Sequence, residues 1–137
     1  MTFSRLPNWR LRLDDYLARV ARAAFRPGIH DCALFAAGGV EAMTGRDPAA
    51  VLRGSYRTIE DGYVRLREMG HRDHVAMAAS LFEALPIMRA RCGDIAVLAD
   101  GKGHLALGLV TGPSIAALGL DGLRFRPLTD GRKVFAV

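Results

Sequence analysis

The stretch FRPGIHDCALFAAGGVEAMTG, residues 25–45, places one cysteine after an acid and before a long run of small apolar residues. Asp31 is a side chain of the kind that caps helices, and Gly45 stands where a left-handed C-terminal cap is needed. We therefore expect a helix from about Asp31 to residue 43 or 44, with Cys32 as its first residue. Alanine and glycine stand on every side of this helix, which predicts a central element that its neighbours approach closely.

Two interpretations of Cys32 follow from its position. The free backbone N–H groups and the dipole at a helix N-terminus stabilise a thiolate, which makes Cys32 a candidate nucleophile. The alternative is a buried structural cysteine, because Ala33, Leu34 and Phe35 directly after it are core residues. Position alone leaves both interpretations open.

The rest of the chain divides into helices followed by strands. Apolar positions at spacings of three and four predict an amphipathic helix that is capped by Asn8, runs to about Ala24 and ends before Pro27. Further helical segments are expected at 47–54 as a short turn, at 58–70, and at 73–85. Short β-compatible runs follow Cys92, namely IAVLAD, HLALGLVT, SIAAL, LRFRPL and KVFAV. The pattern predicts an α+β domain with N-terminal helices packed on a small C-terminal antiparallel sheet or barrel.

Length and composition restrict the classes of protein. The chain has 137 residues, half of them hydrophobic, which suits a single domain over 1–137. Its 17 arginines and 2 lysines outnumber 14 acids, but they are spread along the chain rather than interleaved with aromatic residues, so we do not expect direct binding of nucleic acid. No apolar run is long enough to span a membrane, and the N-terminus has no signal-peptide core.

The cysteines and histidines offer little support for a metal site or a disulfide framework. With no export signal, Cys32 and Cys92 are expected to be free thiols, and a pairing between them remains an alternative. His71 and His74 lack the ligand spacing of a zinc site, so no metal or other cofactor is expected. The glycines in GKGHLALG are interpreted as a hairpin turn rather than a phosphate-binding loop.

Several short motifs then occur in a fixed order. They are His30 to Ala33, Thr44-Gly45 with Asp47-Pro48, Gly93-Asp94, the strand LALGLVTG, and Gly122-Leu123 with Pro127-Leu128. In order and spacing they resemble the NlpC/P60 cysteine peptidases of the papain-like fold. They are most similar to the compact NlpC/P60-like proteins encoded among phage and prophage tail genes. The resemblance extends from Trp9 to Val137.

The resemblance implies a catalytic site of which only one member is clearly present. Cys32 matches the family's nucleophile, whereas Ala106 stands at the family's histidine position, two residues before Gly108. His104 is the candidate base, although it lies two residues further back, roughly 6 to 7 Å along a strand. His30 and Asp31 are expected to support the site from beside Cys32.

The chain also has few residues that could orient the catalytic histidine. The chain has no Gln, and its single Asn is Asn8 in the first expected helix. The candidates that remain are Ser114, Asp121 and Thr129.

The resemblance leads to two functional expectations. The preferred one is a structural or docking component of a phage or prophage tail, at or near the tail tip, whose catalytic site is degenerate or weak. Its partners would be other tail-tip proteins, and the chain would be made in the bacterial cytoplasm without a signal peptide and assembled into the virion tail. The alternative is an active cysteine peptidase that cleaves amide bonds of host peptidoglycan and so assists tail penetration or genome delivery.

Overall fold

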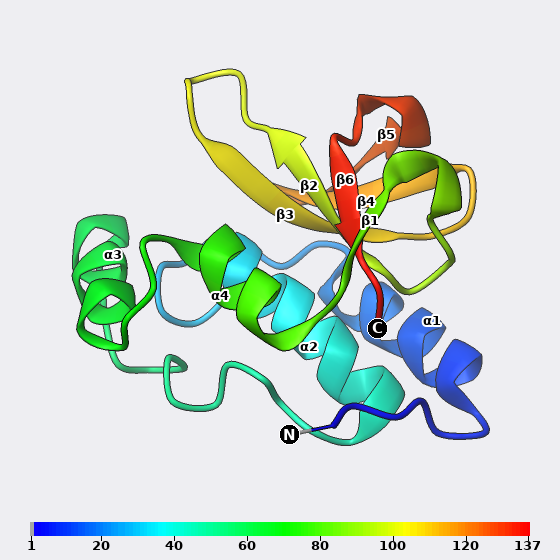
Figure 1. Cartoon of the computed structure of the whole chain (residues 1–137), viewed down its shortest axis with the longest axis horizontal. Helices are drawn as coiled ribbons and strands as arrows, with labels where there is room; N and C mark the ends of the chain where they lie inside the picture. Colours follow the sequence, from blue (N-terminus) through cyan, green and yellow to red (C-terminus); the bar gives the residue numbers. More distant parts are fainter. Residues whose placement is uncertain (1) are drawn as a thin grey trace.

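The fold was obtained as a computed structural model and is described for residues 2–137. Its helices are α1 (Trp9–Val20), α2 (Cys32–Thr44), α3 (Ile59–Glu68) and α4 (His74–Leu81). Its strands are β1 (Ala84–Pro86), β2 (Ile95–Ala99), β3 (Leu105–Val110), β4 (Ser114–Gly119), β5 (Gly122–Pro127) and β6 (Lys133–Phe135). Short 3-10 segments, Ile87–Arg89 (η1) and Leu128–Asp130 (η2), complete the described part. The expected α+β class, with helices before the main sheet strands, is confirmed (Figure 1).

All six strands belong to one antiparallel sheet in the order β1-β6-β2-β3-β4-β5. The last strand, β6, lies between β1 and β2, where Val134 pairs with both Leu85 and Ala96. The C-terminal strand therefore joins the segment after the helices to the rest of the sheet. Within residues 2–137, β1 and β5 are the edges and no pairing between them closes a barrel.

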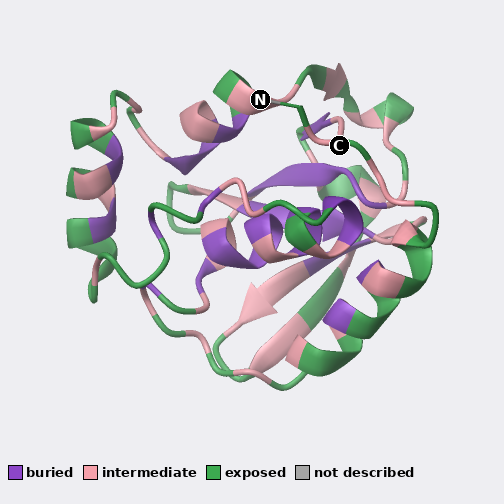
Figure 2. Cartoon of the chain, turned by 90° about the horizontal axis from the view of Figure 1, so that it is seen from below, coloured by how far each residue is buried: buried purple, intermediate pink, exposed green. Residues whose placement is uncertain are grey.

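Helix α2 occupies the centre of the molecule, as its composition predicts. It packs on α1 and on β3, and eight of its thirteen residues are buried (Figure 2). The main core forms between these elements around Phe35, Val40, Leu109 and Phe135, each of which is fully buried.

Two adjacent glycines of α2 allow this close packing. A Cβ atom on Gly38 would lie 2.3 Å from the hydroxyl oxygen of Tyr16 in α1, and one on Gly39 would lie 2.4 Å from Cδ1 of Leu109 in β3. The same tyrosine donates a hydrogen bond to the Phe35 carbonyl at 2.8 Å. Both contacts need a residue without a side chain, because any added carbon would overlap a packed neighbour.

The opposite face of the sheet carries a second core of buried residues from β2, β3, β4 and β6, among them Leu98, Ile115 and Val134. Ile87 of η1 and Leu128 of η2 pack against this cluster. Side chains of β3 therefore alternate between two interiors: Leu107 and Leu109 face α2, whereas Gly108 faces Ile115 and Leu98.

The first and fourth helices are shorter than the sequence predicts. Helix α1 ends at Val20 instead of continuing to about Ala24. Helix α4 ends at Leu81, and the following residues turn extended to form β1, where the prediction of helix to residue 85 is wrong. Pairing of β1 with β6, which lies about fifty residues further along the chain, outweighs local helix propensity there. The short turn at 47–54 is present, with Arg53 N–H donating to the Ala49 carbonyl at 3.1 Å.

Among the described residues, every helix falls short of the length and apolar character that a membrane span requires.

A buried carboxylate ties the N-terminal segment to the sheet. Asp94 is 1% exposed, and its Oδ1 accepts hydrogen bonds from Arg5 Nη2 at 3.3 Å and from Val137 N–H at 3.2 Å. Its Oδ2 accepts one from Arg91 N–H at 2.9 Å. Arg5 also donates to the carbonyls of Cys92 and Val137, so this one cluster joins three distant segments.

We predict that Gly39→Ala destabilises the fold by about 1 to 3 kcal/mol, because the new methyl group overlaps Leu109. This loss must exceed the gain of about 1 kcal/mol that alanine brings to a helix interior. Urea unfolding of the parent and of the variant measures the net change in the free energy of unfolding. The double variant Gly39→Ala/Leu109→Ala should lose less than the sum of the single variants. A Gly39→Ala protein as stable as the parent would contradict the close approach.

We predict that Asp94→Ala lowers the free energy of unfolding by about 2 to 4 kcal/mol, since it removes three hydrogen bonds and leaves Arg5 without its carboxylate partner. The matched control is Asp130→Ala, which breaks an exposed pair with Arg126 and should cost at most about 1 kcal/mol. Equal losses in the two variants would show that the Asp94 cluster is no more important than a surface ion pair.

Candidate functional site

Cys32 lies where the sequence predicts, at the first residue of α2. Asp31 is the N-cap, and its Oδ1 accepts a hydrogen bond from Leu34 N–H at 3.0 Å. The sulfur therefore stands at the positive end of the central helix, beside free backbone N–H groups. Local capping chemistry alone accounts for this placement.

Asp31 also holds the loop in front of the helix. Its Oδ2 accepts hydrogen bonds from Gly28 N–H at 3.0 Å and from the Tyr56 hydroxyl, and the residue is 3% exposed. Gly28 has a φ of +80°, and a Cβ there would lie 1.9 Å from the Tyr56 carbonyl oxygen, so only glycine fits. Asp31 is thus a positioning residue, with both oxygens engaged by the protein.

The thiol of Cys32 is not activated by this position. Burial raises its pKa to about 11, and the negative charge of Asp31 acts in the same direction. The backbone N–H groups of Leu107, Ala33 and Cys32 itself favour the thiolate but do not offset the burial. Loss of hydration thus outweighs the helix terminus, and at neutral pH the group is a protonated thiol.

Two tyrosines lie close enough to the same sulfur to be affected by its charge. The pKa values of Tyr56 and Tyr63 are raised, first by burial, and the charge that Cys32 would carry as a thiolate raises both further. Burial is also the largest effect on the pKa of Cys32, and it favours the neutral sulfur.

His104 lies on the hairpin between β2 and β3, away from this cluster of groups. Its side chain is 68% exposed, and its Nδ1 lies 3.7 Å from Asp100 Oδ2. Asp100 also accepts from the backbone N–H groups of Lys102 and His104, which fixes the predicted hairpin turn. Within residues 2–137 no hydrogen bond joins His104 to Cys32.

The register of β3 explains why Ala106, which stands at the NlpC/P60 histidine position in the resemblance described above, does not face the thiol. Ala106 and Gly108 share one face of the strand, and Gly108 points toward Leu98 and Ile115, away from α2. The residues that face α2 are Leu105, Leu107 and Leu109. A histidine at 106 would therefore project into the second core in this register.

The structure brings a different histidine to the thiol's side of the strand. His74, the first residue of α4, donates from Nε2 to the Leu105 carbonyl at 2.9 Å, while Leu107 N–H acts on the Cys32 sulfur. Leu105 and Leu107 are separated by one residue on the same face of β3. The His74 ring also packs 6.0 Å from that of Tyr63.

Burial lowers the pKa of His74 and keeps its imidazole neutral. In the sequence it is the residue after the capping Asp73, whose side chain accepts from Ala76 N–H. That local signal predicts a helix start but not the neighbour across the fold, which is why sequence reasoning missed it.

His30 belongs to the loop rather than to a catalytic pair. It exchanges backbone hydrogen bonds with Arg26, and its ring packs edge-on against Phe35 with centroids 6.1 Å apart. Its Nε2 is buried without a hydrogen-bond partner among the described residues, and burial lowers its pKa. Both carboxylate oxygens of Asp31 have other hydrogen-bond partners. His30 therefore supports the site by packing against Phe35.

Space beside α2 is limited. The cavity lined by Ala33, His74 and Leu107 holds about 30 Å³, which is about the volume of one water molecule in the liquid. Both cysteines are free. Within residues 2–137, no group of three or more His, Cys, Asp or Glu side chains is arranged to hold a metal ion.

Comparison with known proteins gives a family but no activity. No curated protein matches the chain. Residues 4–137 match a family described as a domain of unknown function, DUF6950, so nearly the whole described fold lies within the match. The chain with this capped Cys32 helix and six-stranded sheet is therefore a member of the DUF6950 family.

Proposed function

We propose that this protein is a structural or docking component of a phage or prophage tail, built on an NlpC/P60-like fold whose catalytic site is silent or weak. The tail context rests on the resemblance of its ordered motifs to tail-encoded NlpC/P60-like proteins. The silence of the site rests on one observation: Cys32 is partly buried, and this burial raises its pKa to about 11. At pH 7 such a group is thiolate in roughly one molecule in ten thousand.

The surroundings of the thiol support the same proposal. A general base must come within about 3 Å of the proton that it removes. His104 instead lies in an exposed hairpin beside Asp100, and the cavity next to His74 has no room for a peptide. The helix start is thus better suited to packing than to acyl transfer.

The alternative, a cysteine peptidase acting on cell-wall amides, is favoured by a single observation. His74 and Cys32 interact with backbone groups of Leu105 and Leu107, which lie along the same edge of β3. In that mechanism His74 rather than His104 would take the thiol proton, and N–H groups at the start of α2 would stabilise the oxyanion. The site would first have to open, because His74 is buried and Cys32 is only partly exposed.

The first test is the rate of Cys32 alkylation by iodoacetamide against pH. The raised pKa predicts that at pH 8 the native thiol reacts roughly a hundredfold more slowly than the same residue in guanidinium-unfolded protein. Mass spectrometry follows Cys32 and Cys92 separately. His104→Ala and His74→Gln should leave the Cys32 rate unchanged; glutamine can still donate to the Leu105 carbonyl. A native Cys32 that reacts faster than the unfolded one, and slows in His74→Gln, would contradict a silent thiol and favour the peptidase instead.

The second test concerns assembly. Particles made from the genome that encodes this chain should contain it at a constant ratio to other tail proteins, measured by quantitative mass spectrometry. Cys32→Ala should change neither that ratio nor infectivity by more than about twofold, because alanine preserves the helix start. Absence of the chain from mature particles would contradict a docking role there. Loss of infectivity with normal incorporation would contradict a silent thiol.

A further inference from the structure

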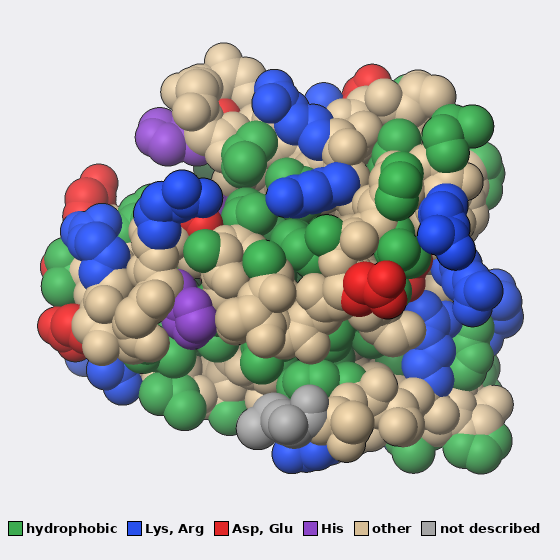
Figure 3. All heavy atoms as spheres, viewed as in Figure 1, with side chains coloured by type: hydrophobic (Ala, Val, Ile, Leu, Met, Phe, Trp, Pro, Cys, Tyr) green, Lys and Arg blue, Asp and Glu red, His purple; other side chains and the backbone are tan. Residues whose placement is uncertain are grey.

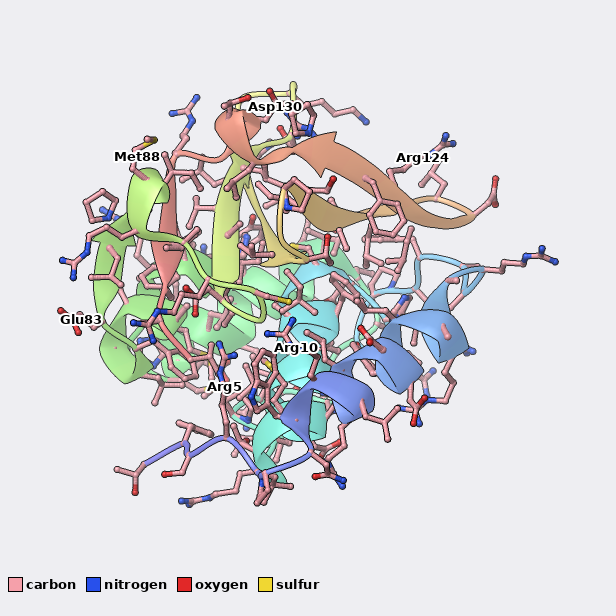
Figure 4. The ribbon with its side chains drawn as sticks, turned by 90° about the vertical axis from the view of Figure 1, so that its right-hand side faces the viewer. Arg5, Arg10, Glu83, Met88, Arg124 and Asp130 are labelled. Atoms are coloured by element: carbon pink, nitrogen blue, oxygen red, sulfur yellow. The ribbon has the colours of Figure 1, made fainter. Side chains whose placement is uncertain are left out.

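The molecule has a large, positively charged cleft remote from Cys32. It measures about 850 Å³ and lies where the segment before α1 meets β1 and the C-terminal residues. Figure 3 shows Lys and Arg side chains gathered along the right-hand margin, and Figure 4 turns that side to the viewer, with Arg5 and Arg10 near its middle. Glu83 lies at the edge of that view and is not part of the lining.

The lining carries four arginines and a single acid. The arginines are Arg5, Arg10, Arg89 and Arg91, and the acid is Asp94. Both oxygens of Asp94 already accept hydrogen bonds from within the protein. Among the described residues, no other acidic side chain in the lining is left to neutralise the remaining positive charge.

Three of the four guanidinium groups are available to a ligand. Arg5 is occupied, since its nitrogens donate to the carbonyls of Cys92 and Val137 and to Asp94. By contrast, Arg10, Arg89 and Arg91 are exposed, and within residues 2–137 their side chains make no ion pair or hydrogen bond. Positive charges that are held together without counter-charges attract an anionic partner.

The neighbouring groups respond to this concentration of charge. The pKa of Arg5 is lowered, first by burial; Asp94 and Cys92 act in the opposite direction, and Arg91 and Arg10 lower the pKa further. Elsewhere some arginines pair with acids, such as Arg53 with Asp47 at 2.9 Å and Arg126 with Asp130 at 3.2 Å.

The rest of the lining is apolar and partly exposed, and includes Leu85, Ala136 and Trp9. The Trp9 ring is covered by the guanidinium groups of Arg5 at 4.1 Å and Arg10 at 4.6 Å. It is thus not a free platform for base stacking, on which binding of single-stranded nucleic acid depends. A volume of this size also exceeds what one inorganic anion fills.

We infer that this cleft binds an acidic peptide segment of a partner protein. Carboxylates of the segment pair with Arg10, Arg89 and Arg91, whose forked donors suit bidentate contacts. Aliphatic side chains of the segment pack on Leu85 and Ala136. The inference rests on the docking role proposed above and identifies the chemistry of the partner, through a surface that does not involve Cys32.

The probe is a fluorescein-labelled peptide of alternating Glu and Leu, titrated with the full chain and followed by fluorescence anisotropy. Binding should weaken as salt is added. Arg10→Gln/Arg89→Gln/Arg91→Gln should lower the affinity at least about tenfold, because the three available guanidinium groups are removed. Arg57→Gln/Arg67→Gln/Arg124→Gln, a control with the same change in charge on exposed residues outside the cleft, should stay within about twofold of the parent.

Three results would overturn the inference. Equal weakening in both triple variants would indicate attraction by net charge alone. Equal binding of a Gln-Leu peptide would remove the role of carboxylates. Tighter binding of a single-stranded oligonucleotide, lost in the cleft variant, would identify the cleft as a nucleic-acid site. The binding assay uses the isolated chain and is independent of particle assembly. If the chain is incorporated into particles but does not bind the acidic peptide, the cleft inference is wrong and the proposed docking role stands.

Discussion

The fold depends on how closely α1 and β3 approach two adjacent glycines of α2. The ring of Tyr16 packs against Gly38 on one side of the helix, and the side chain of Leu109 packs against Gly39 on the other. A helix with side chains at both positions would hold the two layers apart and open voids, which protein interiors tolerate poorly. The partly buried N-terminus of that helix, and with it the environment of Cys32, is a consequence of this packing.

The same packing determines the chemistry of Cys32. A helix terminus favours a thiolate, yet removal of the sulfur from water disfavours any charge, and here the second effect is larger. Asp31 adds negative charge nearby, while its own hydrogen bonds fix the loop rather than activate the thiol. A catalytic cysteine normally has an opposing arrangement, in which a cation or an imidazole facing the sulfur lowers the thiol pKa. The present geometry favours structure over reactivity.

Charge is distributed in two different ways on this protein. Arg5 and Asp94 form a buried cluster with several hydrogen bonds, which connects the first residues with the last strand. Arg10, Arg89 and Arg91 surround that cluster and remain unpaired within residues 2–137. The first arrangement stabilises the fold, because each guanidinium nitrogen of Arg5 donates to an acceptor. The second leaves donors directed to solvent, where a partner can use them.

The sequence by itself determined the α+β class, the Asp31 cap with Cys32 after it, and the hairpin at Asp100 to His104. These features depend on propensities and hydrogen bonds among residues that are close along the chain. Only the tertiary structure decided that β1 would replace the end of the fourth helix and that His74 would approach β3. It also decided the ionisation of Cys32, because strand register and burial are produced by contacts between residues far apart in sequence.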